Sequence, residues 1–171
     1  MNKDNVFRDK SLLQTNYKPD IILHRDQQIN QIASILAPVL KGDRPSNLFV
    51  YGKTGTGKTL SVQYVQEELL KKAEELNVDV RFEYLNCKLK KVADTEYRIL
   101  AALIGQLGGH VPPTGLPTDQ VWTKFIELVD SKKQLIIFIL DEVDQAVKKM
   151  SDNFLYSLTR LNSELNQAQI S

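Results

Sequence analysis

The hydrophobic and polar positions along this chain predict strands that alternate with helices. Residues 134–140 are predicted to form a strand, because 135–140 are a continuous apolar run of the kind that is buried on both faces of a parallel sheet. Residues 47–51 are a second short run, apolar and rich in strand-forming side chains. Residues 79–85 alternate apolar with polar positions, which indicates a strand near a sheet edge. Residues 168–171 have the pattern expected at the start of a further strand.

Between these runs, apolar residues recur at the spacing of helices that bury one face. Pro38 is expected to kink the last turn of the first helix, and the stretch 108–117 is too dense in glycine and proline for regular structure. Strands that alternate with helices predict an α/β fold with a parallel sheet. The expected helices cover 25–40, 60–76, a segment from Asp94 or Thr95 to Leu107, a segment that Thr118 or Asp119 caps, and a segment that Ser151 or Asp152 caps.

Composition narrows the classes of function. The 171 residues are enough for one domain with a core, and the net charge of +1 gives no global attraction to nucleic acid or membrane. Cys87 is the single cysteine, which excludes an internal disulfide framework and a zinc site built only from cysteines. The polar N-terminus has no secretory signal, and no apolar run reaches the length of a membrane span. These features predict a cytoplasmic protein with no membrane partner.

Residues 52–59 fit the phosphate-binding pattern G-x-x-x-x-G-K-[ST], and they lie between the expected strand 47–51 and the expected helix 60–76. Glycines let backbone N–H groups turn toward phosphates, and the helix N-terminus adds partial positive charge. Lys58 is expected to reach the β- and γ-phosphates of ATP, and the Thr59 hydroxyl is expected to bind Mg²⁺. The candidate residues for binding ATP or ADP are Gly52, Lys53, Thr54, Gly55, Thr56, Gly57, Lys58, Thr59 and Leu60.

The apolar run 135–140 ends in Asp141 and Glu142, which is the pattern of a Walker B element. The carboxyl end of a buried parallel strand opens onto the ligand crevice of the sheet. We therefore expect Asp141 to hold Mg²⁺ opposite Thr59, and Glu142 to orient and deprotonate the attacking water. The alternative is that both acids cap or solvate the following turn, as we expect of Asp144. A separate glutamate after the metal-binding aspartate favours an ATPase over a simple nucleotide kinase.

Several ordered blocks of the chain carry a more specific signal. They are His24–Ile29, Ile35–Leu40, Pro45–Thr59, Tyr84–Cys87, Asp141–Asp144 and Leu155–Asn162. These blocks resemble the archaeal replication initiators, which are AAA+ ATPases related to the origin recognition complex and its cell-division-control partner. The resemblance implies a three-layer P-loop NTPase fold of the AAA+ type and a slow, switch-like ATPase. It also implies that the protein binds duplex origin DNA, joins other initiator subunits and helps to load the replicative helicase at the nucleoid.

The same resemblance implies a division of the chain. Residues 1–23 would be an N-terminal arm and adenine-side segment, and residues 24–171 an AAA+ core that is truncated after the Walker B strand and the following helix. The family's lid and winged-helix DNA-binding domain would then be absent. In the family, the strand that begins near Ala168 lies between the strands that carry the two motifs. An isolated chain that lacks most of it is expected to be marginally stable and nearly inactive.

The resemblance also suggests which residues contact the base and the DNA. Ile22, His24 and Arg25 are the candidates for the adenine side, although this strip could simply cover the sheet edge. A helical insertion that touches duplex DNA in the family would fall within residues 93–117. Lys88, Lys90 and Lys91 form a local basic patch that could contact phosphates, or could be an ordinary solvated loop.

Two other classes of function remain open from the sequence. One is a nucleotide-gated switch in signalling or defence that binds no DNA. The other is a different AAA+ ATPase of DNA metabolism, such as a clamp loader. Clamp loaders commonly carry a zinc-binding cysteine cluster after the P-loop helix, so the single cysteine argues against that version.

Overall fold

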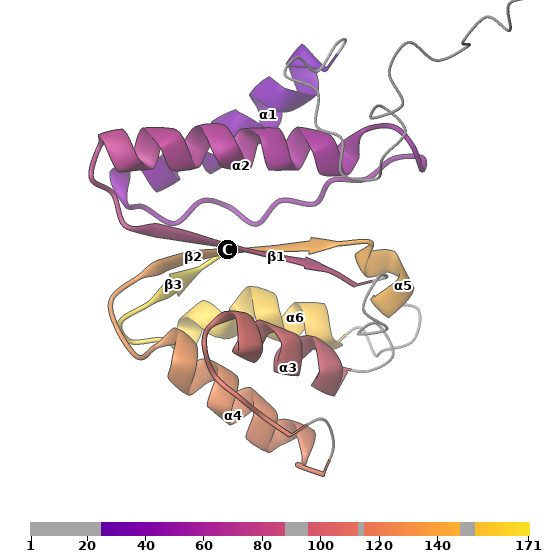
Figure 1. The fold of residues 1–171 in the computed structure, drawn as a ribbon, viewed down its shortest axis with the longest axis vertical. Helices are drawn as coiled ribbons and strands as arrows, with labels where there is room; N and C mark the ends of the chain where they lie inside the picture. Colours follow the sequence, from indigo (N-terminus) through magenta and orange to yellow (C-terminus); the bar gives the residue numbers. More distant parts are fainter. Residues whose placement is uncertain (1–24, 88–95, 113–114, 148–152) are drawn as a thin grey trace, which may run out of the picture.

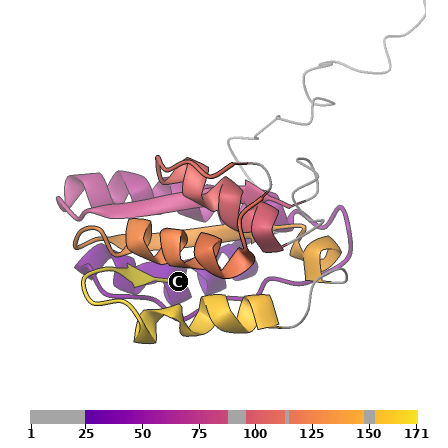
Figure 2. The same ribbon diagram turned by 90° about the horizontal axis from the view of Figure 1, so that it is seen from below.

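Three layers of secondary structure build the fold in the computed structural model, which describes residues 25–87, 96–112, 115–147 and 153–171 (Figure 1). Helices α1 and α2 cover one face of a parallel sheet, and α3, α4 and α6 cover the other, as the turned view in Figure 2 also shows. The strands are β1 (Val80–Asn86), β2 (Leu135–Asp141) and β3 (Gln169–Ile170), paired in the order β1-β2-β3. The helices are α1 (Asp26–Leu36), η2 (Ala37–Lys41), α2 (Lys58–Glu75), α3 (Glu96–Gln106), α4 (Thr118–Val129), α5 (Val143–Val147), α6 (Asn153–Arg160) and η4 (Leu161–Ser163). The predicted three-layer α/β fold is confirmed.

Strand β2 lies at the centre of the core because its two faces are both covered. Ile136 packs against apolar side chains of α3 and α4 on one face of the sheet. Leu135 and Ile137 pack against Val39 on the opposite face. Successive side chains of a strand point to opposite faces, so an unbroken apolar run is what burial on both sides requires. Among the described strands β1 is at the edge of the sheet, as its alternating pattern predicted.

The helices agree with the predicted pattern, with small corrections at their ends. The chain changes from α-helix to 3₁₀-helix at Ala37, next to Pro38, in the last turn where the sequence predicted a kink. The prediction that Thr118 or Asp119 caps α4 is wrong. Pro117 is the N-cap, because its carbonyl accepts the first helical bonds while Thr118 is already helical. The other proposed caps, Asp94, Thr95, Ser151 and Asp152, lie outside the described residues. No helix in the described part of the chain is long and apolar enough to cross a membrane.

The predicted strand over residues 47–51 is not formed. The segment is extended, but a strand requires a neighbour, and the adjacent β3 is only two residues long. The Ser171 hydroxyl reaches the Asn47 side chain at 3.2 Å, at one end of the segment. Phe49 and Tyr51 are 71% and 82% exposed, and their rings stack on each other. The prediction that residues 47–51 form a strand was therefore wrong, although their backbone is extended.

An asparagine side chain occupies the edge of β3 that faces away from β2. The backbone N–H groups of Gln169 and Ser171 donate to the carbonyls of Gln134 and Ile136. The N–H and carbonyl of Ile170, between them, therefore point away from β2. The Asn162 amide donates to the Ile170 carbonyl and accepts the Ile170 N–H, both at 2.8 Å. These two bonds satisfy the backbone of Ile170 without a further strand.

Asp130 holds the turn that leads into β3. Its carboxylate accepts the backbone N–H groups of Ala168 at 2.9 Å, Asn166 at 2.9 Å and Gln167 at 2.7 Å. These bonds, that from Ala168 most of all, lower the pKa of Asp130 from 3.8 to about 2. Backbone donors favour the ionised carboxylate, so ionisation of Asp130 and the closed turn stabilise each other.

We expect Asp130→Asn to lower the melting temperature near neutral pH and to lose this effect in acid. Because the folded pKa lies below the unfolded one, the carboxylate stabilises the fold above about pH 4 and loses that contribution as the pH falls toward about 2. Melting curves of the wild type and the variant across this range measure the difference. Asp79→Asn, at an exposed loop position, is the control. A difference that persists unchanged at pH 2 would contradict the role given to Asp130.

Candidate nucleotide-binding site

The P-loop leads from the extended segment into α2. Gly55 and Gly57 have φ angles of 78° and 77°, in the left-handed region that glycine adopts without strain. Gly57 is the N-cap of α2, and its carbonyl accepts the N–H of Ser61 at 2.9 Å. The first backbone N–H groups of a helix have no acceptor within it, so the amides of residues 58–60 are free to meet an anion.

Lys58 lies across this loop. Its ammonium donates to the carbonyls of Gly52 at 2.9 Å and Lys53 at 3.0 Å. The Thr56 hydroxyl also donates to the Lys53 carbonyl, at 2.8 Å, while the Thr54 side chain is exposed. The loop is therefore closed around a positive charge that phosphate oxygens can attract away from the two carbonyls.

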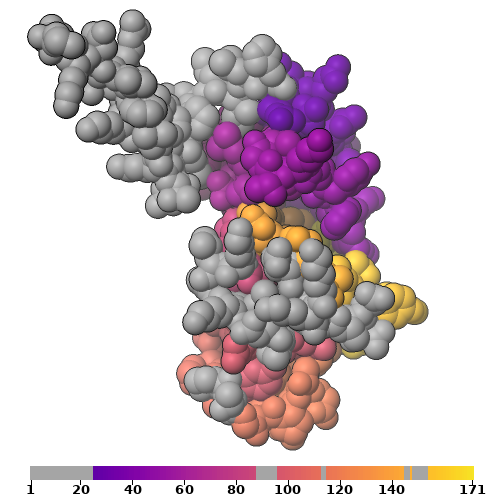
Figure 3. All heavy atoms as spheres, turned by 90° about the vertical axis from the view of Figure 1, so that its right-hand side faces the viewer, coloured from indigo at the N-terminus to yellow at the C-terminus, as the bar shows by residue number. Residues whose placement is uncertain are grey.

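The two predicted halves of the site meet. The Thr59 hydroxyl donates to Oδ2 of Asp141 at 2.7 Å, although the residues are 82 positions apart in the chain. Thr59 is in the first turn of α2, and Asp141 is the last residue of β2. In Figure 1 the start of α2 and the end of β2 lie at the same side of the molecule, and Figure 3 shows the molecule from that side. The carboxyl end of the buried strand thus places a carboxylate at the phosphate-binding loop, as the sequence predicted.

Asp141 has a second hydroxyl partner that the sequence did not predict. Tyr84 donates to the same Oδ2 at 2.7 Å, and the Glu142 N–H donates to Oδ1 at 2.9 Å. Burial, and then the bond to Asp141, raise the pKa of Tyr84 to about 12, so the phenol remains a donor at physiological pH. Tyr84 begins one of the blocks that resemble the initiator family, but as one of three apolar or aromatic positions on an alternating strand it carried no sign of this contact.

Glu142 has a backbone conformation that is uncommon for its residue type. Its φ is 55°, which is in the left-handed region. Such residues cost free energy and cluster at functional sites, where the surroundings hold them. Here the bond from the Glu142 N–H to the Asp141 side chain fixes the turn, and the two acids lie in different surroundings. Asp141 is held by donors, whereas Glu142 begins the bend into α5 and is half-buried.

Arg25 is the described member of the predicted adenine-side strip. Its Nε lies 3.9 Å from the position that a Cβ on Gly57 would occupy, so the guanidinium is next to the P-loop. Ile22 and His24 lie outside the described residues, as do Lys88, Lys90 and Lys91 of the basic patch. The structure therefore brings Arg25 to the loop.

The oxygen atoms of Thr59 and Asp141 are suitable ligands for Mg²⁺. Hydroxyl and carboxylate oxygens are the ligands of hard cations, and Mg²⁺ keeps several waters and phosphate oxygens in its shell. The described residues contain no group of three or more His, Cys, Asp and Glu side chains that could enclose a metal. A site of one hydroxyl and one carboxylate therefore suits a metal that a nucleotide brings with it, and the free amides of the P-loop suit the phosphates.

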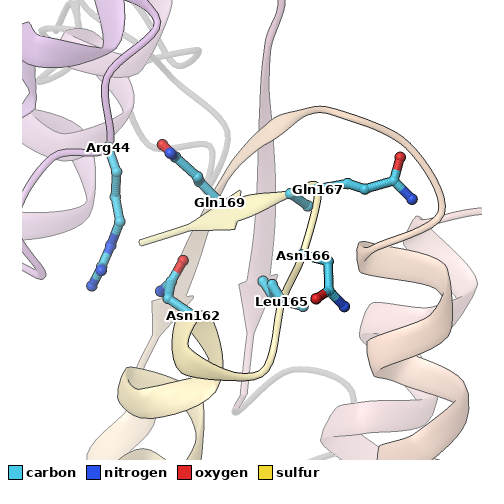
Figure 4. Close-up of a pocket in the computed structure, with 7 residues that line it drawn as sticks. Arg44, Asn162, Leu165, Asn166, Gln167 and Gln169 are labelled. Atoms are coloured by element: carbon cyan, nitrogen blue, oxygen red, sulfur yellow. The ribbon is translucent and has the colours of Figure 1, made fainter.

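A separate hollow lies at the opposite end of the sheet (Figure 4). It is lined by Arg44, Asn162, Leu165, Asn166, Gln167, Ala168 and Gln169. Gln169 pairs with Leu135 at the start of β2, six residues before Asp141, which corresponds to about 20 Å along a strand. This hollow is therefore distinct from the site at the P-loop, and its amide side chains come from η4, from the turn before β3 and from β3 itself.

Comparison with known proteins identifies similar chains. Residues 22–168 match the family model described as the AAA ATPase domain. The chain is 46% identical over 170 residues to the ORC1-type DNA replication protein of Thermococcus kodakarensis, covering 97% of this chain and 40% of that protein. It is 47% identical over 166 residues to ORC1-type DNA replication protein 1 of Methanosarcina mazei, covering 97% of this chain and 39% of that protein.

A solved structure shares the fold. The chain superposes on the Aeropyrum pernix ORC1 protein in complex with DNA with a TM-score of 0.84 and 34% identity, covering 95% of this chain and 42% of that one. The resemblance to archaeal replication initiators that the sequence blocks suggested is confirmed. The chain spans about 40% of the length of the curated relatives that it matches.

Proposed function

This chain belongs to the AAA ATPase domain family, and we propose that it binds and hydrolyses ATP as the nucleotide-controlled part of a DNA replication initiator. The contact between Thr59 and Asp141 is the observation that supports the catalytic half of this proposal most strongly. It joins a phosphate-binding motif to a carboxylate from a distant strand, which is the arrangement that nucleotide hydrolysis requires.

Each residue of the site has a distinct role in the proposal. The amides of residues 58–60 bind phosphate oxygens, and Lys58 leaves the two loop carbonyls to contact the β- and γ-phosphates. Thr59 and Asp141 hold Mg²⁺, which when bound neutralises charge on the phosphates. Glu142 orients a water molecule and accepts its proton as the water attacks. Arg25 lies beside the loop, on the side where we place the adenine.

The initiator role rests on the relatives and on the sequence blocks. Proteins named ORC1-type DNA replication proteins are 46–47% identical to this chain, and the superposed Aeropyrum pernix protein was solved with DNA. By this likeness we propose that the protein binds duplex origin DNA, joins other initiator subunits and helps to load the replicative helicase. We place it in the cytoplasm at the nucleoid, and we assign residues 24–171 to its AAA+ core. Most of the DNA contact is proposed to lie outside these residues.

The initiator role is tested by fluorescence anisotropy on the complete protein. Labelled origin-like and scrambled duplexes are titrated with ATP and with ADP at several salt concentrations. We expect tighter binding to the origin-like duplex and an affinity that depends on the nucleotide. Equal binding to both duplexes that falls steeply with salt would reflect phosphate contacts alone and would contradict origin recognition. Absence of DNA binding would favour a signalling or defence switch.

A further inference from the structure

The hydrogen bond from Tyr84 to Asp141 is a contact that the two motifs do not explain. A nucleotide site of this type requires the Thr59 hydroxyl, the Asp141 carboxylate and the Glu142 base. Tyr84 comes from a different strand, yet it shares Oδ2 of Asp141 with Thr59 at the same distance of 2.7 Å. One oxygen of the proposed metal-binding carboxylate is thus held by two hydroxyl donors from two separate elements.

The register of β1 and β2 explains how this bond forms. Tyr84 is paired with Ile139, so Asp141 is two residues further along β2. Residues two apart on a strand share a face, and the rise over two residues is about 6.6 Å, which a tyrosine side chain spans. Phe82, two residues before Tyr84, packs in the cluster with α1 and α2, so Tyr84 extends from the same face toward the start of α2. The bond is therefore a consequence of sheet geometry.

We propose that Tyr84 is a positioning residue for the metal site, because its hydroxyl fixes the Asp141 carboxylate in the orientation that Mg²⁺ binding requires. The inference rests on the proposed Mg²⁺–nucleotide site. Oδ2 is held by Tyr84 and Oδ1 by the Glu142 amide, so donors on both oxygens oppose rotation of the carboxylate. The Thr59 hydroxyl then directs its hydrogen to Oδ2, and its lone pairs are left to face the metal. Partners that orient metal ligands in this way tune metal affinity.

The variant Tyr84→Phe tests this role because it removes one oxygen atom and keeps the ring. In the complete protein, binding of a fluorescent ADP analogue is followed while Mg²⁺ is titrated, and again in excess chelator. We expect the Mg²⁺ concentration for half-maximal effect to rise roughly tenfold, since loss of such a partner lowers metal affinity by about 10- to 100-fold. Affinity for the analogue in chelator should stay at the wild-type value, because Tyr84 does not touch the phosphate loop in this proposal.

Two controls separate positioning from a structural role. Tyr64→Phe removes a hydroxyl from a half-buried tyrosine that packs between α1 and α2, and it should leave the Mg²⁺ dependence unchanged. In an Asp141→Asn background, Tyr84→Phe should add no further loss, because its effect acts through that carboxylate. Melting curves report whether each variant is folded.

The outcomes are distinct. An unchanged Mg²⁺ dependence in folded Tyr84→Phe would overturn the positioning role while leaving the nucleotide site intact. Equal losses of analogue affinity with Mg²⁺ and in chelator would assign Tyr84 to the structure of the sheet and would also overturn it. Binding of the analogue to the wild type with no dependence on Mg²⁺ would overturn the metal site itself, and the inference with it.

Discussion

Replacement of Glu142 by glutamine is expected to lower the rate of ATP hydrolysis by about 10²- to 10⁴-fold, the usual contribution of a general base. The amide keeps the size and shape of the side chain and loses the ability to accept a proton. ATP binding should stay close to the wild-type affinity, because the phosphate contacts in our proposal come from the P-loop. The bond that holds the turn comes from the backbone of Glu142 and also survives. Single-turnover hydrolysis and equilibrium binding measure the two effects separately.

A matched substitution controls for the loss of a negative charge. Glu127→Gln changes an exposed glutamate on α4, on the far side of the sheet from the P-loop, and should leave the rate unchanged. A Glu142→Gln protein that hydrolyses ATP at the wild-type rate would show that another group activates the water. Loss of ATP binding together with hydrolysis would instead assign Glu142 to the fold of the loop.

Replacement of Lys58 by alanine is expected to weaken ATP binding by roughly 10- to 100-fold. A charge-assisted hydrogen bond contributes about 1.5–3 kcal/mol, and each 1.4 kcal/mol corresponds to tenfold in affinity. The ammonium bridges the Gly52 and Lys53 carbonyls, so it already lies at the loop that we propose to bind the phosphates. Its removal also leaves those carbonyls without this donor. Titration with a fluorescent ATP analogue measures the loss.

Lys72→Ala is the control for Lys58→Ala. Lys72 is an exposed lysine in the last turn of the same helix, so its removal changes net charge and helix composition in the same way. Equal affinity in the Lys58 and Lys72 variants would contradict the phosphate-binding role of the loop. Melting curves should show both variants folded, because Lys58 contacts the loop and not the core.

The arrangement of the candidate site was predictable where a short segment of sequence determines it. The P-loop pattern specifies its own turn and the helix that follows, and the structure has that turn with Gly55 and Gly57 at positive φ. Asp141 was predictable because a continuous apolar run implies a buried parallel strand, and the end of such a strand is where ligands bind. The contact between Thr59 and Asp141 then follows from the fold.

Features that depend on pairing between distant segments were not predictable in the same way. Tyr84 reaches Asp141 only because β1 and β2 pair in one register, and no local pattern specifies a register. Residues 47–51 have a strand-like composition, but their pairing depends on the neighbouring chain, which here is the two-residue β3. Helix α5 was missed because its five residues are too few for a helical period to show.

Calorimetric titration of the complete protein with a non-hydrolysable ATP analogue, with and without Mg²⁺, tests most directly whether these residues form a nucleotide switch. We predict saturable binding of one nucleotide per P-loop, with an affinity that Mg²⁺ increases by about tenfold or more, since the metal links the phosphates to Thr59 and Asp141. Titrations that show no saturable heat, or the same affinity with and without Mg²⁺, would contradict the site proposed here.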